Sequence, residues 1–349
     1  MGRKMEALFE KYKKLSIAVF GDYCLDEYLW IDAALNEPSL ETGLVAYQCV
    51  KRETYPGAAG TIAKNLANLG VGTIYAVGCA GDDGRGLELC RGLDTLKVDR
   101  EHLLIAQDRV TPTHTKPWIM EDAGTREMNR IDIKNWTPTP PELEQAVLER
   151  LTGLMNCIDA LIILDHFTEE NCGIVTDKTR SVVAQIARCN PNKIVYADSR
   201  CRIARFDNMI LKGNQNEICN AVFEPNKGSL AKFTDVEIDR ACRTLLEKTG
   251  QPVICTMGEK GLRIYCADDN NMIEIHGIAV SGQIDVCGAG DMFTSAFVSA
   301  LAAGADLMQA GQIGNTAAAL CVQQLGATGH VSAEDIIANI GKEVITDGR

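Results

Sequence analysis

One short stretch combines small residues with an acid in a spacing that suits an anion. Three small residues, Gly288, Ala289 and Gly290, end an extended run. Asp291 follows, where a predicted helix would begin. Glycines let backbone amides approach a ligand, and a helix start supplies unpaired amides and a positive dipole end. An aspartate beside a bound anion can orient or deprotonate a hydroxyl, so the stretch suits phosphoryl transfer. The alternative is a loop followed by an aspartate that caps the helix.

The composition limits the classes of protein to which this chain can belong. Of its 349 residues, 46% are hydrophobic and 23% are charged, which is ordinary for a globular protein. The formal net charge of -12 argues against nucleic acid or an anionic membrane surface as the main partner. The first residues are charged, and no apolar run reaches the length of a membrane span, so we expect a cytoplasmic protein.

The cysteines are numerous, and both the cysteines and the five histidines are dispersed along the chain. The 14 cysteines form no Cys-x-x-Cys pair, and the five histidines lie far apart, so the spacing does not indicate a zinc site. We expect the cysteines to be reduced and to act as small buried apolar residues. Cys287 has no neighbour in the sequence that would activate it as a nucleophile, so we expect a packed residue there.

Short apolar runs alternate with helical patterns along most of the chain. The predicted strands are 16–20, 73–78, 160–166, 193–200, 209–211 and 253–258, with a return strand at 262–265. The predicted helices are 60–69, 142–155, 174–187, 292–303 and 307–325, and Gly326 follows the last of them. This rhythm predicts an α/β fold with a mainly parallel central sheet. Polar residues recur just past the strand ends, where such sheets bind ligands.

A second kind of β-structure is predicted outside this core. Polar and apolar residues alternate from 102 to 132, with Leu103–Ile105 as the first strand, and 44–52 also favours a strand. Alternation predicts a half-exposed sheet, such as a lid. Because no low-complexity linker divides the chain, we expect one domain over 1–349, with a lid built from about 23–54 and 105–133.

Three motifs, in this order, resemble those of the ribokinase (PfkB) family of carbohydrate kinases. Gly57–Gly70 resembles the amino-terminal signature, Asn214–Glu217 matches Asn-x-x-Glu, and Asp285–Phe293 resembles the Asp-Thr-x-Gly-Ala-Gly-Asp signature. The resemblance covers 15–331 and implies a ribokinase-like three-layer fold with a small β-sheet lid. Within the family the chain looks most like the heptose-phosphate kinase subgroup, through Gly21–Tyr28, Pro56-Gly57, Thr113–Lys116 and Arg130–Asp132.

The resemblance implies catalytic roles at the second signature. Asp291 would act as the base toward a sugar hydroxyl. The transferring phosphoryl oxygens would be held by the amides of Gly288, Ala289 and Gly290. Because a helix start favours a charged carboxylate, we expect Asp291 to be ionised at pH 7.

The resemblance also implies a site for ATP and Mg²⁺. Asn214 and Glu217 would organise Mg²⁺ through water, although a turn asparagine and a surface glutamate are the alternative. Lys212 would reach the ATP phosphates, unless it is an ordinary exposed lysine. The remaining nucleotide residues would be Thr256, Gly258, Gly261 and Asn315; helix packing is the alternative role for Asn315. Whether a monovalent cation is also needed stays open.

A sugar pocket is implied at the first signature. Asp26 would accept hydrogen bonds from two sugar hydroxyls, beside a turn formed by Gly57, Ala58 and Thr61. An ordinary exposed acid is the alternative for Asp26. Ala58 stands where a second glycine is common, and Thr61 where the family has a sugar-contacting asparagine. These departures leave the identity of the sugar open.

The expected lid contains two cationic residues and bears on the oligomeric state. Lys116 and Arg130 would meet a phosphate already present on the substrate, although a solvated lid face explains them equally well. A lid alone would expose an apolar face, and family members often pair their lids, so we expect a homodimer through the lid.

We therefore expect an ATP-dependent kinase that phosphorylates a hydroxyl of a sugar or sugar phosphate, with a heptose-phosphate-like substrate among the candidates. The alternatives are a nucleoside or other small-molecule kinase of the same fold and a non-catalytic sugar or nucleotide sensor. A sensor need not keep Asp291 or Glu217, which argues against that class. An oxidoreductase is disfavoured because Gly81–Gly86 lacks a strand-to-helix Gly-x-Gly-x-x-Gly.

Overall fold

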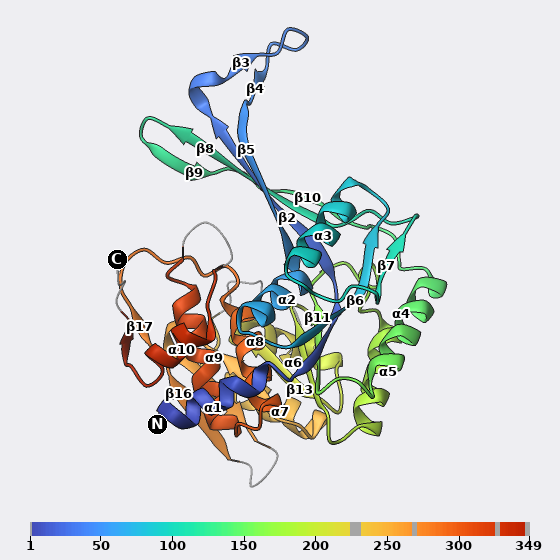
Figure 1. Cartoon of the computed structure of the whole chain (residues 1–349), viewed down its shortest axis with the longest axis vertical. Coiled ribbons are helices and arrows are strands. Elements are labelled where there is room, and N and C mark those ends of the chain that lie inside the picture. Colours follow the sequence, from blue (N-terminus) through green and yellow to red (C-terminus); the bar gives the residue numbers. More distant parts are fainter. Residues whose placement is uncertain (1, 224–231, 267–270, 325–328, 346–349) are drawn as a thin grey trace.

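The computed structural model describes residues 2–223, 232–266, 271–324 and 329–345. It contains a large sheet inside a body of helices and a smaller sheet that projects from that body (Figure 1). The strand order of the large sheet is β16-β15-β14-β13-β12-β11-β1-β6-β7. Neighbouring strands are parallel from β7 to β14, whereas β15 pairs antiparallel with both β14 and β16. Its strands are β1 (Ser16–Gly21), β6 (Thr73–Gly81), β7 (Leu103–Ala106), β11 (Ala160–Asp165), β12 (Ile194–Ser199), β13 (Ile210–Asn214), β14 (Val253–Thr256), β15 (Gly261–Tyr265) and β16 (Met272–His276).

Helices cover both faces of the large sheet because its central strands are apolar on both sides. In β1, Ile17 and Val19 belong to the core on one face, and Ala18 and Phe20 belong to the core on the other. The first face carries α1 (Gly2–Tyr12), α2 (Ala59–Asn68), α3 (Gly84–Thr95), α8 (Ala289–Ala302), α9 (Leu307–Cys321) and α10 (Ala333–Asn339). The second carries α4 (Pro141–Leu154), α5 (Asp177–Cys189), α6 (Gln215–Phe223) and α7 (Asp235–Thr249). The predicted three-layer α/β fold is confirmed.

The smaller sheet, which we call the outer sheet, has the strand order β10-β8-β2-β5, with β9 paired to β8. Strands β2 and β8 are parallel, whereas β2 and β5 are antiparallel. A short β3-β4 hairpin extends its tip (Figure 1). Its strands and the remaining short ones are β2 (Tyr23–Asp32), β3 (Glu37–Pro38), β4 (Val45–Ala46), β5 (Cys49–Ala58), β8 (Thr113–Glu121), β9 (Gly124–Glu127), β10 (Ile131–Ile133), β17 (Ala279–Val280) and β18 (Val344–Ile345).

Two predicted boundaries of the lid were wrong. Leu103–Ile105 belongs to β7, which pairs with β6 at the edge of the large sheet. An edge strand buried on one face shows the same alternation as a lid strand, which explains the error. The strand expected at 44–52 is divided between β4 and β5, and β5 continues to Ala58. The last long helix was expected to run to Leu325, but α9 ends at Cys321; Leu325 and Gly326 themselves lie outside the described residues.

No helix in the described ranges has both the length and the apolar character that a membrane span requires. The cysteines carry free thiols, as expected. The prediction that they are buried is wrong for part of the set, because some thiols lie at the surface in β5, at the end of α5 and in loops. The exposed ones are Cys49, Cys157, Cys189, Cys201 and Cys287.

Candidate active site

The glycine-rich stretch forms the start of α8 and leaves backbone amides without partners. Gly288 precedes the first turn with φ 79°, a conformation that favours glycine. The amide of Met292 donates to the Gly288 oxygen at 2.9 Å. Within the part of the chain that the structure describes, the amides of Gly290 and Asp291 have no acceptor. This is the local geometry that suits an anion at a helix start.

Asp291 lies in the first turn of α8 and does not cap it. The cap position belongs to Gly288, where no side chain bonds to the helix amides. Burial raises the pKa of Asp291 to about 7, and repulsion from Asp198 acts in the same direction. The prediction that Asp291 is fully ionised at pH 7 was therefore wrong for the ligand-free chain. Burial and a second carboxylate outweigh the helix dipole.

A buried ion pair stands beside this helix start. Lys212 at the end of β13 and Asp198 at the end of β12 are register partners, and Lys212 Nζ lies 2.6 Å from Asp198 Oδ2. A Cβ atom at Gly290 would lie 3.0 Å from Lys212 Nζ, so the ammonium group adjoins the free amides. Burial alone would lower the pKa of Lys212, but Asp198 holds it above its ordinary value. Lys212 is thus a buried cation, and Asp198 is a site residue that sequence reasoning missed.

Asn214 and Glu217 form a reciprocal cap at the start of α6. Asn214 Oδ1 accepts the amide of Glu217 at 2.9 Å, and Glu217 Oε2 accepts the amide of Asn214 at 2.7 Å. Burial raises the pKa of Glu217, and Asp198 raises it further against the opposing effect of Lys212. Glu217 is therefore a half-buried member of the charged cluster and not a surface residue. Its carboxylate and that of Asp198 are the oxygen donors that suit a hydrated Mg²⁺ ion.

The predicted nucleotide residues gather at one edge of the large sheet. Thr256 ends β14 beside the end of β13. The turn that follows has φ 60° at Gly258 and φ 94° at Gly261, and a Cβ atom at Gly261 would lie 2.1 Å from a backbone oxygen of β16. Asn315 Nδ2 donates to the oxygen of His276 at 2.9 Å, and His276 pairs in register with Gly261. This bond supports the packing role that was the alternative for Asn315.

The expected sugar residues meet around a buried carboxylate on β2. Asp26 Oδ1 lies 3.2 Å from His114 Nδ1, and Asp26 Oδ2 lies 3.6 Å from Lys116 Nζ. Burial alone would raise the pKa of Asp26, but these two neighbours hold it below its ordinary value. Lys116 Nζ also bonds to the Tyr28 hydroxyl at 3.1 Å. A Cβ atom at Gly57 would lie 2.9 Å from Asp26 Cγ, so the glycine leaves room above the carboxylate.

The other predicted sugar residues differ in their placement. Ala58 precedes α2 with φ 52° and ψ −116°, which glycine adopts more easily. Thr61 is buried, and its hydroxyl donates to the Pro56 oxygen at 3.4 Å. Arg130 is exposed, and its guanidinium group bonds to both oxygens of Asp132 at 2.7 and 2.8 Å. Its bonds are thus to Asp132 and not to the other predicted pocket residues.

The residues expected to hold the phosphoryl group lie near the residues expected to hold the sugar. Asp26 contributes to the raised pKa of Asp291, and α2 bonds to α8 where Ser295 Oγ donates to the Ile62 oxygen at 3.3 Å. Cys287 is exposed, so the prediction of a packed residue was wrong. Partial desolvation raises the pKa of the Cys287 thiol, which agrees with the expectation that it is not an activated nucleophile.

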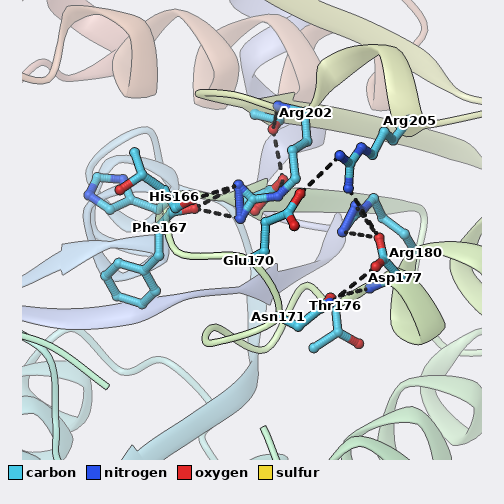
Figure 2. A network of polar contacts seen from close by, with 12 residues as sticks. His166, Phe167, Glu170, Asn171, Thr176, Asp177, Arg180, Arg202 and Arg205 are labelled. Carbon is cyan, nitrogen blue, oxygen red and sulfur yellow. Dashed lines mark hydrogen bonds and ion pairs between the residues drawn. The ribbon is translucent and has the colours of Figure 1, made fainter. Parts of the chain in front are cut away.

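A polar network supports the loop that follows β11 (Figure 2). Arg202 donates two hydrogen bonds to the Phe167 oxygen, at 2.8 and 3.0 Å. Asp22 accepts the amide of His166 at 2.9 Å. These bonds hold the His166 ring with its centroid 5.5 Å from that of His114, behind the Asp26 carboxylate. No sequence motif predicts this network, because the order of the strands brings its members together.

Comparisons of the sequence with known proteins find relatives over most of the chain. A sequence model described as pfkB family carbohydrate kinase matches residues 16–334. The protein named bifunctional protein HldE from Shewanella sp. (strain W3-18-1) is 29% identical over 335 residues, which are 95% of this chain and 65% of that protein. The chain thus spans about 65% of the length of this curated relative.

Solved structures show the same fold. Ribokinase from Arabidopsis thaliana, complexed with ribose and ATP, has a TM-score of 0.67 at 19% identity, over 94% of this chain and 99% of that chain. Phosphofructokinase-2 from Escherichia coli, in complex with potassium, has a TM-score of 0.68 at 17% identity over the same shares, 94% and 99%.

Proposed function

The chain belongs to the pfkB family of carbohydrate kinases, phosphotransferases with an alcohol group as acceptor, and we propose that it transfers the γ-phosphoryl group of ATP to a hydroxyl of a sugar or sugar phosphate. One observation supports this proposal above the others. At the start of α8, the free amides of Gly290 and Asp291 adjoin the Asp291 carboxyl group and the buried ammonium group of Lys212. An anion hole, a base and a cation at one place are what phosphoryl transfer requires.

In the proposed reaction, Asp291 accepts the proton of the acceptor hydroxyl as that oxygen attacks the γ-phosphorus, and the bond from this phosphorus to the bridging oxygen breaks so that ADP leaves. The free amides and Lys212 stabilise the charge on the transferring phosphoryl oxygens. A pKa near 7 suits a base that works at neutral pH. Glu217 and Asn214 would hold the water ligands of Mg²⁺, which would neutralise phosphate charge when bound with ATP.

The sugar acceptor would bind beside Asp26, on β2 of the outer sheet. Asp26 is charged and buried, so it can accept hydrogen bonds from two sugar hydroxyls above Gly57, with Ala58 and Thr61 shaping the adjoining turn. Lys116 adjoins this carboxylate and would be the cation that meets a phosphate already on the substrate. The resemblance to the heptose-phosphate kinase subgroup, with the likeness to HldE, supports a heptose-phosphate-like acceptor.

The test is ADP release with Mg·ATP across pentoses, hexoses, heptoses, their monophosphates and nucleosides. We expect release above the background of ATP hydrolysis with at least one sugar or sugar phosphate. Phosphorus NMR of the product would identify the hydroxyl. Turnover with nucleosides alone would replace the proposed acceptor class, and no turnover with any acceptor would overturn the proposal.

A further inference from the structure

We propose that Cys24, Asp26 and His114 form a binding site for a divalent transition-metal ion, with Zn²⁺ as the ion that best suits the donor set. A thiolate, a carboxylate and an imidazole are ligand types that Zn²⁺ accepts together. A sulfur ligand sets this site apart from one for Mg²⁺, which prefers oxygen. Sequence spacing gave no sign of it, because the third ligand comes from a strand almost ninety positions further along the chain, where the fold places it beside the first two.

Strand geometry places the three side chains on one face of the outer sheet. Cys24 and Asp26 are two positions apart on β2, so their side chains point to the same side. His114 on β8 is the register partner of Asp26, and paired residues project to the same face. The site is therefore built on two hydrogen-bonded strands and not on a flexible loop.

The separations match those of a metal site. His114 Nδ1 lies 3.2 Å from Asp26 Oδ1 and 3.7 Å from Cys24 Sγ, and all three ligand atoms lie within 4.8 Å of one another. Ordinary zinc bond lengths at a tetrahedral angle place nitrogen and oxygen about 3.3 Å apart and sulfur and nitrogen about 3.6 Å apart. All three residues are buried, which shields the ion from bulk water.

Space for the ion is left on the side of β5. Gly57 is the register partner of Cys24. A Cβ atom at Gly57 would lie 2.7 Å from Cys24 Sγ and 2.9 Å from Asp26 Cγ, so a side chain there would fill the space over the cluster. A fourth ligand, such as water, can enter from this side, as in zinc sites that keep an open position.

The neighbouring charged and titratable groups leave the ligand atoms accessible. Lys116 Nζ approaches the other carboxylate oxygen, Asp26 Oδ2, and is held by Tyr28, so it weakens the attraction for a cation without occupying Oδ1. The His166 ring lies behind His114, and its buried Nε2 has no hydrogen-bond partner among the described residues. Burial lowers the pKa of His166, so it adds no positive charge at neutral pH.

A bound ion would occupy the floor of the proposed acceptor pocket, because Asp26 is also expected to hold sugar hydroxyls. Zn²⁺ should then raise the apparent KM for the acceptor and leave the apparent KM for ATP unchanged. This kinetic consequence rests on the proposed function, whereas the binding of the ion does not.

Direct titration tests the site. The metal-free chain, kept reduced with a phosphine, is titrated with Zn²⁺, and bound zinc is counted by mass spectrometry after desalting. We expect one tight equivalent, at least about tenfold weaker in Cys24→Ala and His114→Ala. Cys287→Ala, which removes an exposed thiol of the neighbouring loop, should bind as the parent chain does. With Co²⁺, the sulfur-to-cobalt charge-transfer band should be present in Cys287→Ala and absent from Cys24→Ala.

Equal binding of Zn²⁺ by folded Cys24→Ala, His114→Ala and parent chains would overturn the proposal. So would absence of the cobalt band from the parent chain. If Cys24→Ala does not fold, His114→Gln carries the same test, with circular dichroism as the check of folding. Zinc binding without kinase activity would contradict only the proposed function, and kinase activity without zinc binding would contradict only the metal site.

Discussion

At the scale of single residues, the raised pKa of Asp291 links the proposed chemistry to pH. A base must be unprotonated to accept a proton, and burial raises the pKa of Asp291 to about 7. We expect kcat/KM for the acceptor to rise with pH up to about 7 and to level off above it. A profile of kcat/KM from about pH 5 to pH 9 would show this. A rate that is already maximal near pH 5 would contradict the assignment.

The carboxyl group of Asp291 should also lower the free energy of unfolding at neutral pH. The ordinary pKa of 3.8 is raised in the folded chain, so the folded state keeps a proton that the unfolded state has released. The free energy of unfolding therefore falls as the pH rises from about 4 to about 7, and the full cost persists above that range. We expect Asp291→Asn to stabilise the ligand-free chain at pH 8 by at least about 1 kcal/mol in urea unfolding. If Asp291→Asn is less stable than the parent chain at pH 8, then neighbouring groups compensate the charge of Asp291 in the folded state.

The half-buried Glu217 allows a test of whether this carboxylate holds the water ligands of Mg²⁺. Glu217→Gln keeps an oxygen that can accept the amide of Asn214 but removes the negative charge. We expect the Mg²⁺ concentration for half-maximal activity to rise at least about tenfold, with little change in Tm. Glu259→Gln, an exposed change in the nearby turn, is the matched control. An unchanged Mg²⁺ requirement would remove Glu217 from the site.

At the scale of elements, the junction of β5 and α2 carries backbone strain. Ala58 adopts φ 52° and ψ −116°, a conformation that costs a non-glycine residue about 1–3 kcal/mol. We expect Ala58→Gly to raise the free energy of unfolding by about 1 kcal/mol, because relief of strain exceeds the added freedom of the unfolded chain. Urea unfolding with an unchanged slope would measure this gain. The control Ala63→Gly, in the interior of α2, should be destabilising; equal losses from both changes would refute the strain.

The elements also show why some features could be predicted and others could not. β1 and β11 carry apolar runs at 17–20 and 160–164, which are typical of a strand buried on both faces, so they were predicted. β7 was misplaced because an edge strand and a lid strand share one pattern. The cluster of Cys24 and His114 could not be foreseen, because it depends on the register of β2 against β8, which local sequence does not specify.

The residues of the candidate site also divide into those that local sequence predicts and those that depend on tertiary structure. Asp291 and Glu217 were found because their motifs are local and contain glycine or a cap. Asp198 was missed because an acid at a strand end gains meaning only from its register partner, Lys212. The raised pKa of Asp291 was missed because burial and Asp198 are tertiary facts. Sequence thus predicted residues that meet at the candidate site, and tertiary structure determines their protonation states.

At the scale of the whole molecule, the outer sheet projects from the body (Figure 1). Apolar side chains in and beside its β3-β4 hairpin are exposed. Leu40 is fully exposed, and Leu44 and Tyr47 are 71% and 51% exposed. We propose that the outer sheets of two chains pair, as the family resemblance implies. Light scattering should give twice the mass of one chain, and Leu40→Asp combined with Leu44→Asp should halve it. A monomeric mass for the unaltered chain would contradict this pairing.

The central claim is that Asp291 is the base of a kinase that uses a sugar or sugar-phosphate hydroxyl. Its most direct test is single-turnover phosphoryl transfer from Mg·ATP to the preferred acceptor, compared between the parent chain and Asp291→Asn. We expect the variant to bind ATP normally and to transfer the phosphoryl group about 100-fold to 10,000-fold more slowly. Transfer by Asp291→Asn at the rate of the parent chain would contradict the claim.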